Sequence, residues 1–290
     1  MIETILIPTS GTPTDSAVFK TALAVAKPLR AHMQFYHVRF STIEAMVHTP
    51  HFDFCLGDAA AASAFSYLRQ HDESLSAQAT EHFHTFCKTY GITALDTPSP
   101  SRPMSASYLQ ERDRPEARLL AHARHSDLII LGRRQTTDLM PQNLIESLLM
   151  ASGRPLIIAP ETTSIAALKT VVVGWQETPE AARSLGAAIP LLKHADTVIL
   201  VGVSAYAKEA ASALEQVVEQ LAWHDITAKT HIIVGDPKEA RAHLSREIAE
   251  RHADMLVVGG YQRGPWREAL FGGVTESIID HAKCPVFLMH

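Results

Sequence analysis

The sequence is poor in cysteine and has no long hydrophobic run. Its three cysteines, Cys55, Cys87 and Cys284, are odd in number and widely spaced. We therefore expect no disulfide framework and a reducing, cytoplasmic location. No stretch approaches the roughly 18 apolar residues that a membrane span needs, so no membrane partner is expected. The apolar run at residues 1–8 is too short for a signal peptide and has no basic segment before it.

The chain also lacks a strong charge of either sign. Charged residues make up 20% of the composition and the net charge is −5, with no basic tail. This balance argues against nucleic acid as a partner. Hydrophobic residues make up 46%, an ordinary globular share, and 290 residues are enough for two domains that each bury a core.

The most informative feature is repetition between the two halves of the chain. Four short apolar segments in the first half recur in the same order in the second. The pairs are 2–8 with 170–174, 33–38 with 197–203, 126–132 with 253–259, and 154–159 with 284–289. Apolar strands separated by helices are typical of strands buried on both faces of a parallel sheet. The pattern predicts an α/β doubly wound domain that is present twice.

The two halves differ in length. Pro8 and Gly174 are 166 positions apart, whereas Asp127 and Asp254 are only 127 apart. The first half therefore carries about 39 extra residues, most of them within 39–80. We predict one domain at 1–160 with this insertion, a polar linker near 161–164, and a second domain at 166–290.

The end of the second half carries a family resemblance. The relevant segments are 235–237, 252–254, 259–261, 267–268, 271–275 and 284–286. Their order and spacing resemble a universal stress protein domain, and the first half matches more weakly. The resemblance implies two open parallel sheets of five strands in the order 3-2-1-4-5, of the adenine nucleotide alpha hydrolase-like type. It also implies that the last strand of each domain pairs with the other domain, and that the protein serves stress tolerance by binding rather than catalysis.

Some members of that family bind ATP through a spaced series of glycines. Glycines let backbone N–H groups approach phosphates, and a following helix N-terminus favours their negative charge. The second half reads Gly259, two residues, Gln262, nine residues, then Gly272 and Gly273, with Thr275 close by. Two of the four signature positions are changed. In the first half the later glycines are replaced by Gln142 and Asn143, and the loop is three residues shorter.

ATP-binding members also place an aspartate after the first strand, at the switch point where doubly wound sheets bind ligands. The corresponding residues here are Ser10 and Gln176, so neither half supplies the carboxylate. The resemblance extends the candidate nucleotide site of the second half to Val203, Val258 and Val274, and implies Mg²⁺ with ATP. The alternative is that both loops are structural turns.

Two other motifs have a structural alternative. The stretch 10–16 resembles a pyrophosphatase-type phosphate loop, but a helix cap at Thr14 or Asp15 explains it as well. His48, His51 and Cys55 have a spacing that zinc accepts, yet Pro50 interrupts it and no fourth ligand is evident. We assign no metal site and no catalytic residue.

A long amphipathic stretch at 59–90 has apolar residues at helical spacing. Three interpretations of this stretch are open: it closes over the ligand cleft of the first half, it provides a homodimer surface, or it only packs on the core.

Three functional hypotheses apply to the whole protein: a stress protein whose second domain binds an adenine nucleotide, a nucleotide-free scaffold acting through protein partners, and a slow ATP hydrolase. The enzyme is the weakest because only Glu268 and Glu276 lie near the loop.

Overall fold

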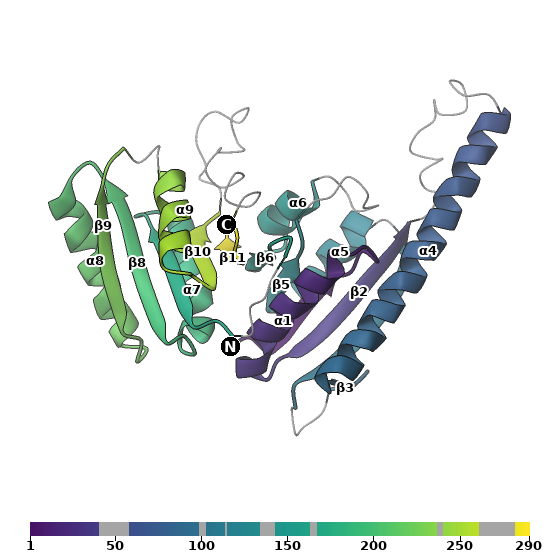
Figure 1. Ribbon diagram of the computed structural model, residues 1–290, viewed down its shortest axis with the longest axis horizontal. Helices are drawn as coiled ribbons and strands as arrows, with labels where there is room; N and C mark the ends of the chain where they lie inside the picture. Colours follow the sequence, from purple (N-terminus) through teal and green to yellow (C-terminus); the bar gives the residue numbers. More distant parts are fainter. Residues whose placement is uncertain are drawn as a thin grey trace.

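Strands and helices alternate along the chain (Figure 1). The computed structural model describes residues 1–40, 58–98, 103–113, 115–133, 143–162, 167–236, 240–260 and 282–290. The first half contains β1 (Thr4–Pro8), α1 (Asp15–Leu29), β2 (His32–Phe40), α4 (Asp58–Tyr90), β3 (Thr93–Ala94), β4 (Ser105–Asp113), α5 (Pro115–Arg124), β5 (Leu128–Leu131), α6 (Leu144–Ala151) and β6 (Leu156–Ile158). The second contains β7 (Thr170–Trp175), α7 (Pro179–Leu192), β8 (Thr197–Ser204), α8 (Ala207–Ala222), β9 (Ala228–Val234), α9 (Ala240–Glu250), β10 (Met255–Gly259) and β11 (Val286–Met289).

All described strands belong to one sheet. Its eleven strands run in the order β3-β4-β2-β1-β5-β6-β11-β10-β7-β8-β9. The prediction of two five-stranded sheets is therefore wrong in the number of sheets, because the two sets of strands join into one sheet and β3 adds a sixth strand to the first half. The order 3-2-1-4-5 is found in β4-β2-β1-β5-β6 and in β9-β8-β7-β10-β11, and the predicted pairing of the last strands of the two domains is confirmed. The physical reason for the single sheet is the pairing of the two last strands, β6 and β11, which lie antiparallel with Ile157 opposite Phe287. Every other strand pair in the described ranges is parallel.

The apolar strands predicted from sequence are buried because helices cover both faces of the sheet. One core cluster contains Ile7 and Phe287 and lies beneath α1, α4, α7 and α8. The other contains Leu6 and Leu288 and lies beneath α5, α6 and α9. Each cluster includes residues of both halves, so the core continues across the β6–β11 junction.

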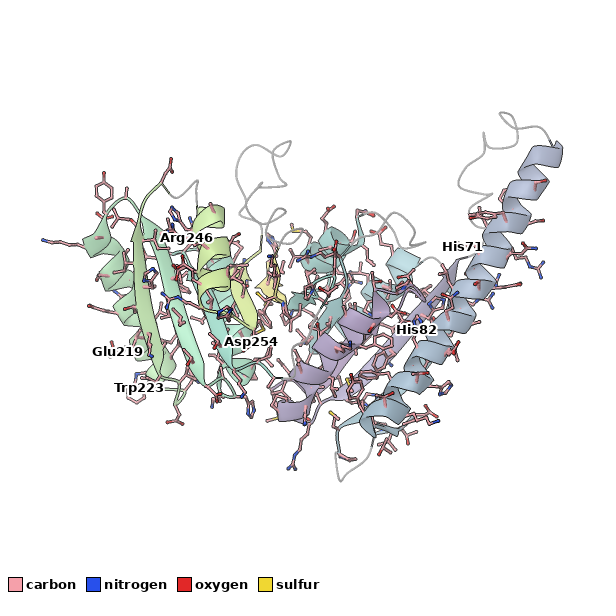
Figure 2. The ribbon with its side chains drawn as sticks, viewed as in Figure 1. His71, His82, Glu219, Trp223, Arg246 and Asp254 are labelled. Carbon is pink, nitrogen blue, oxygen red and sulfur yellow. The ribbon has the colours of Figure 1, made fainter. Side chains whose placement is uncertain are left out.

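An aspartate holds the start of the first strand in each half. Asp127 Oδ2 accepts hydrogen bonds from the backbone N–H of Glu3 and Thr4, at 2.8 and 3.0 Å. Asp254 Oδ2 does the same for Lys169 and Thr170, at 2.9 and 2.8 Å. Figure 2 labels Asp254 at this end of the second half. The same device thus stands at corresponding places in both halves.

The helix α4 is the main difference between the halves. It has 33 residues, whereas α8, which occupies the same place in the second half, has 16. Its carboxy-terminal part packs on the sheet through Leu75, Ala79, Phe83 and Phe86, and its amino-terminal part runs past the end of β2 (Figure 1). The periodicity at 59–90 therefore predicted one helix correctly. None of the helices that the structure describes has the length and hydrophobicity needed to cross a bilayer.

Candidate functional site

The carboxyl ends of the parallel strands form the candidate site edge in each half. In an open doubly wound sheet, ligands bind outside this edge, where the strand order reverses. The reversal falls between β1 and β5 in the first half and between β7 and β10 in the second. The two edges are built differently.

In the first half, the loop after β1 is organised around Asp15. This carboxylate is 2% exposed. It accepts hydrogen bonds from the N–H of Ser10 at 3.0 Å and of Gly11 at 2.9 Å, and from Ser10 Oγ at 3.0 Å. Asp15 is the first residue of α1, and Thr14 makes no side-chain capping bond there. The aspartate thus fixes the loop rather than capping the helix in the usual way, and the loop N–H groups that a phosphate would need already have partners.

The long helix α4 lies directly on this loop. Gly11 has φ +79°, and a Cβ added to it would lie 2.1 Å from the carbonyl oxygen of Leu75. His82, on the same helix, donates from Nδ1 to Asp15 Oδ2 at 3.2 Å. Figure 2 shows His82 on the side of α4 that faces the rest of the first half. Of the three interpretations of the stretch 59–90, closure over the first-half edge agrees best with these contacts.

A further polar group, His37, is buried at this edge. His37 donates from Nδ1 to the carbonyl of Thr9 at 2.8 Å, and its Nε2 has no partner among the described residues. Burial lowers the pKa of His37, whereas the hydrogen bond to Asp15 raises the pKa of His82. At neutral pH the edge therefore combines a neutral histidine with one whose charged form is favoured by Asp15.

In the second half, the structure brings four of the predicted site residues to one edge. Gln176 follows β7, Val203 lies near the end of β8, and Val258 and Gly259 end β10; β7 pairs with both β8 and β10. Gln176 is exposed and Val203 is half-buried. Val258 is a core residue, 8% exposed, so we infer that any contact it makes with a ligand uses its backbone.

Gly259 has a packing role that the sequence did not indicate. A Cβ at this position would lie 2.7 Å from the backbone nitrogen of Ala181 and 3.0 Å from the carbonyl carbon of Glu180. The glycine thus allows β10 to approach the first turn of α7. The predicted phosphate role of Gly259 remains a prediction, but close packing alone already requires a glycine here.

The start of α7 adds residues that the sequence analysis missed. Thr178 caps the helix by accepting from the N–H of Ala181 at 3.2 Å, and Pro179 occupies the first helical position. Threonine followed by proline is a helix-start signal, so this end could have been located from sequence. Beside it, Trp175 Nε1 is buried without a hydrogen-bond partner among the described residues. The last residue of β7 therefore carries a buried indole N–H, and the N-terminus of α7 follows it in the chain.

The remaining predicted site residues lie outside the described ranges. These are Gln262, Gly272, Gly273, Val274 and Thr275, and also the zinc candidates His48, His51 and Cys55. Within the described ranges, no three His, Cys, Asp or Glu side chains gather in a metal-binding arrangement. Cys87 and Cys284 are both buried free thiols, and burial raises their pKa to about 11 and about 12. Neither thiol is activated as a nucleophile.

Comparison with known proteins bears on the second half in particular. Residues 167–290 match the model of the universal stress protein family. This region contains the whole order β9-β8-β7-β10-β11 and the α7 edge described above. A search of curated protein sequences gave no match to the chain.

Solved structures extend the likeness in fold to the first half. A universal stress protein from Archaeoglobus fulgidus is 15% identical with a TM-score of 0.68, over 99% of this chain and 97% of that one. A putative universal stress protein from Pseudomonas aeruginosa is 14% identical with a TM-score of 0.55, over 99% and 93%. At such identities the likeness concerns the fold alone.

Proposed function

We propose that this protein serves in a stress response by binding, and that its second half holds an adenine nucleotide with low affinity. The observation that carries the proposal is the universal stress protein match of residues 167–290, together with the switch point between β7 and β10. Sheets of this topology bind ligands at that place.

The residues at this edge allow a nucleotide but fit it less closely than the family pattern does. The Gln176 amide both donates and accepts, so it can hydrogen-bond a base in place of a carboxylate. We assign the phosphates to the side of Gly259 and of Gly272–Thr275. The N-terminus of α7, which lies against Gly259, offers a partial positive charge that the acidic Glu180 in its first turn weakens. Magnesium bound with ATP neutralises phosphate charge.

The first half is assigned a supporting role. Its loop N–H groups at Ser10 and Gly11 are bonded to Asp15, and α4 lies against Gly11. We therefore expect at most one nucleotide site per chain. Two equivalent sites would contradict this assignment.

The sharpest test of nucleotide binding replaces Gln176 with the aspartate that ATP-binding members of the family have at this position. Equilibrium dialysis with labelled ATP and magnesium would compare the wild type with Gln176→Asp and with Gln220→Asp, an exposed control on α8. We expect Gln176→Asp to tighten binding by up to about tenfold, the effect of one additional hydrogen bond to a charged group. The control should leave the affinity unchanged. Equal affinities of all three proteins would remove Gln176 from the site.

Gly259→Ala alone is a poor test of the site. Its Cβ would contact the backbone of α7, so lost binding could reflect lost packing. The variant is informative only with an unfolding measurement beside it. If Gly259→Ala keeps its stability and its ATP affinity, the phosphate assignment at this glycine is wrong.

A nucleotide-free scaffold is the second candidate function. The change to Gln176 and the glutamine at position 262 favour it, because both depart from the ATP-binding pattern of the family. Mass spectrometry of small molecules carried through native purification separates the two functions: a co-purified adenine nucleotide supports the first and its absence supports the second. In either case we expect no phosphate release from ATP beyond the buffer rate.

A further inference from the structure

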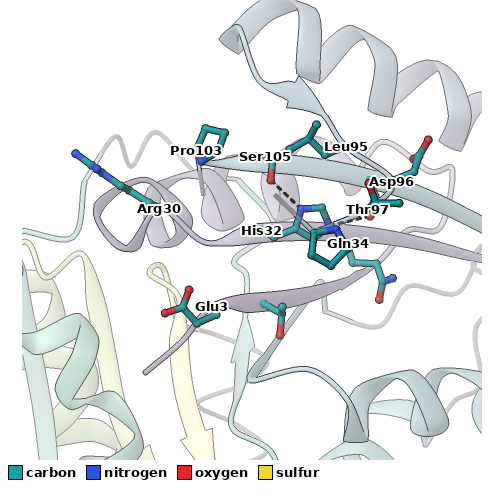
Figure 3. A pocket seen from close by; sticks show the side chains of 12 residues that line it. Glu3, Arg30, His32, Gln34, Leu95, Asp96, Thr97, Pro103 and Ser105 are labelled. Carbon is teal, nitrogen blue, oxygen red and sulfur yellow. Dashed lines mark hydrogen bonds between the residues drawn. The ribbon is translucent and has the colours of Figure 1, made fainter. Parts of the chain in front are cut away.

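A cavity opens at the amino ends of β1, β2 and β4, the opposite edge of the sheet from the nucleotide site. Its volume is about 350 Å³. It lies between the sheet and the segment after β3 (Figure 3). Protein pockets for small molecules range from about 300 to 1,000 Å³, so this one suits a small ligand.

The cavity is lined by polar side chains where a buried sheet face is normally apolar. In the strand register, Thr4 lies opposite His32 and His32 opposite Ser105, while Gln34 lies between Leu6 and Ser107. The face that carries Leu6 is core elsewhere in the sheet.

The second half shows what this face looks like without a cavity. There, Val172 lies opposite Ile199, which is 5% exposed and takes the position that Gln34 has in the first half. The first half thus carries a glutamine where its counterpart carries a core isoleucine. The Gln34 amide has no hydrogen-bond partner within the described part of the chain and points toward the cavity (Figure 3).

His32 is held between two serine hydroxyls. Its Nδ1 lies 2.9 Å from Ser105 Oγ and its Nε2 lies 2.9 Å from Ser107 Oγ. Burial lowers the pKa of His32, so the ring is neutral at pH 7 and one nitrogen donates while the other accepts. Each serine keeps hydrogen-bonding capacity for a ligand, because a hydroxyl offers one donor and two acceptor positions.

Charge and shape narrow the ligand class. Two carboxylates, Glu3 and Asp96, and a single guanidinium, Arg30, border the cavity, so it disfavours anions. Leu95, Pro98 and Pro103 give it an apolar side. A ring-shaped polyol matches this arrangement, since it carries hydroxyl groups at its edge and C–H groups on its face.

We propose that this cavity binds an uncharged polyhydroxylated molecule of monosaccharide size. Gln34, Ser105 and Ser107 bind its hydroxyl groups, and His32 keeps the two serines in place. This site is independent of the nucleotide site and occupies the other edge of the sheet.

Saturation-transfer NMR on the full chain tests the proposal with D-glucose and myo-inositol as probes. Glucose 6-phosphate is the charged comparison. Gln34→Leu removes the amide while restoring the apolar character found in the second half, and Ser107→Ala removes one hydroxyl. Gln110→Leu is the matched control, because Gln110 is on β4 but exposed and outside the cavity.

We expect saturation transfer from the wild-type protein to at least one neutral probe. The affinity for that probe should be at least about fivefold lower in Gln34→Leu and in Ser107→Ala, because each variant loses one hydrogen bond to the ligand. The affinity of Gln110→Leu should equal that of the wild type. Glucose 6-phosphate should bind more weakly than glucose. Absence of transfer to both neutral probes would overturn the proposal. So would tighter binding of the phosphate ester, or unchanged affinity in both cavity variants. Because ATP binding is measured separately, failure here leaves the proposed function standing.

Discussion

Glycines at two site edges serve packing between backbones. Gly259 lies against the first turn of α7, and Gly11 lies against the carbonyl of Leu75 in α4. Only Gly11 also has a positive φ, at +79°. Its replacement therefore meets both a steric clash and an unfavourable backbone conformation.

Gly11→Ala should destabilise the protein by more than about 3 kcal/mol, since α4 must move away from the loop for the methyl group to fit. Gly186→Ala is the control: Gly186 lies in the exposed surface of α7 with open space around its Cα, and alanine there should stabilise by about 0.5–1 kcal/mol. Urea unfolding measures both changes. A Gly11→Ala protein as stable as the wild type would show that α4 does not bear on this loop in solution.

At the scale of elements, α4 is held on the loop by an ion pair as well as by its apolar side. His82 and Asp15 form this contact, and the His82 side chain is 35% exposed while that of Asp15 is 2% exposed. The pKa of His82 is raised in the folded protein, chiefly by its hydrogen bond to Asp15. The stabilising contribution is therefore complete below the unfolded pKa of about 6.5 and is lost as the pH rises through the higher folded pKa.

His82→Gln should consequently cost stability at pH 6 and little at pH 9. We expect a difference below about 1 kcal/mol, because a third of the histidine is exposed and solvent screens the pair. Unfolding free energies of wild type and variant across pH 5.5–9 measure it. His37, whose pKa burial lowers, destabilises both proteins in acid and largely cancels in the comparison. A difference that grows with pH would contradict this assignment.

The sequence predicts the strands that are buried on both faces, because burial on both faces requires apolar side chains. The strands β1, β5, β7 and β10 are of this kind. The positions of β4 and β9 were not predicted, because their side chains are largely polar and partly exposed. The cavity at His32 was missed because Ser105 lies 73 positions away. Serines at alternate positions of a strand, 105 and 107, were the available signal.

Strand patterns do not specify which edge strands meet, so the junction between the halves was predicted only through the family resemblance, which implied pairing of the two last strands. The β6–β11 pair joins the halves through Phe287, which is fully buried. Because both cores cross this junction, the molecule should unfold as one cooperative unit.

Phe287→Ala should lower the free energy of unfolding by about 3–5 kcal/mol, the usual cost of such a cavity. Trp223→Ala, at an 84% exposed residue after α8, should change it by no more than about 0.5 kcal/mol (Figure 2). Fluorescence and circular dichroism during thermal unfolding would report one coincident transition for the wild type. Two separated transitions would show that the halves unfold independently.

The place of β11 also sets an order of events during synthesis. This strand lies in the middle of the sheet, beside β6, yet it is synthesised after all the other described strands. A first half that folds on emergence presents β6 as an open edge, with unpaired backbone groups, until about 130 further residues have been made. The nascent chain therefore passes through a stage in which β6 can pair with a neighbouring nascent chain. Pairing with the four-residue strand β11 of the same chain ends that exposure.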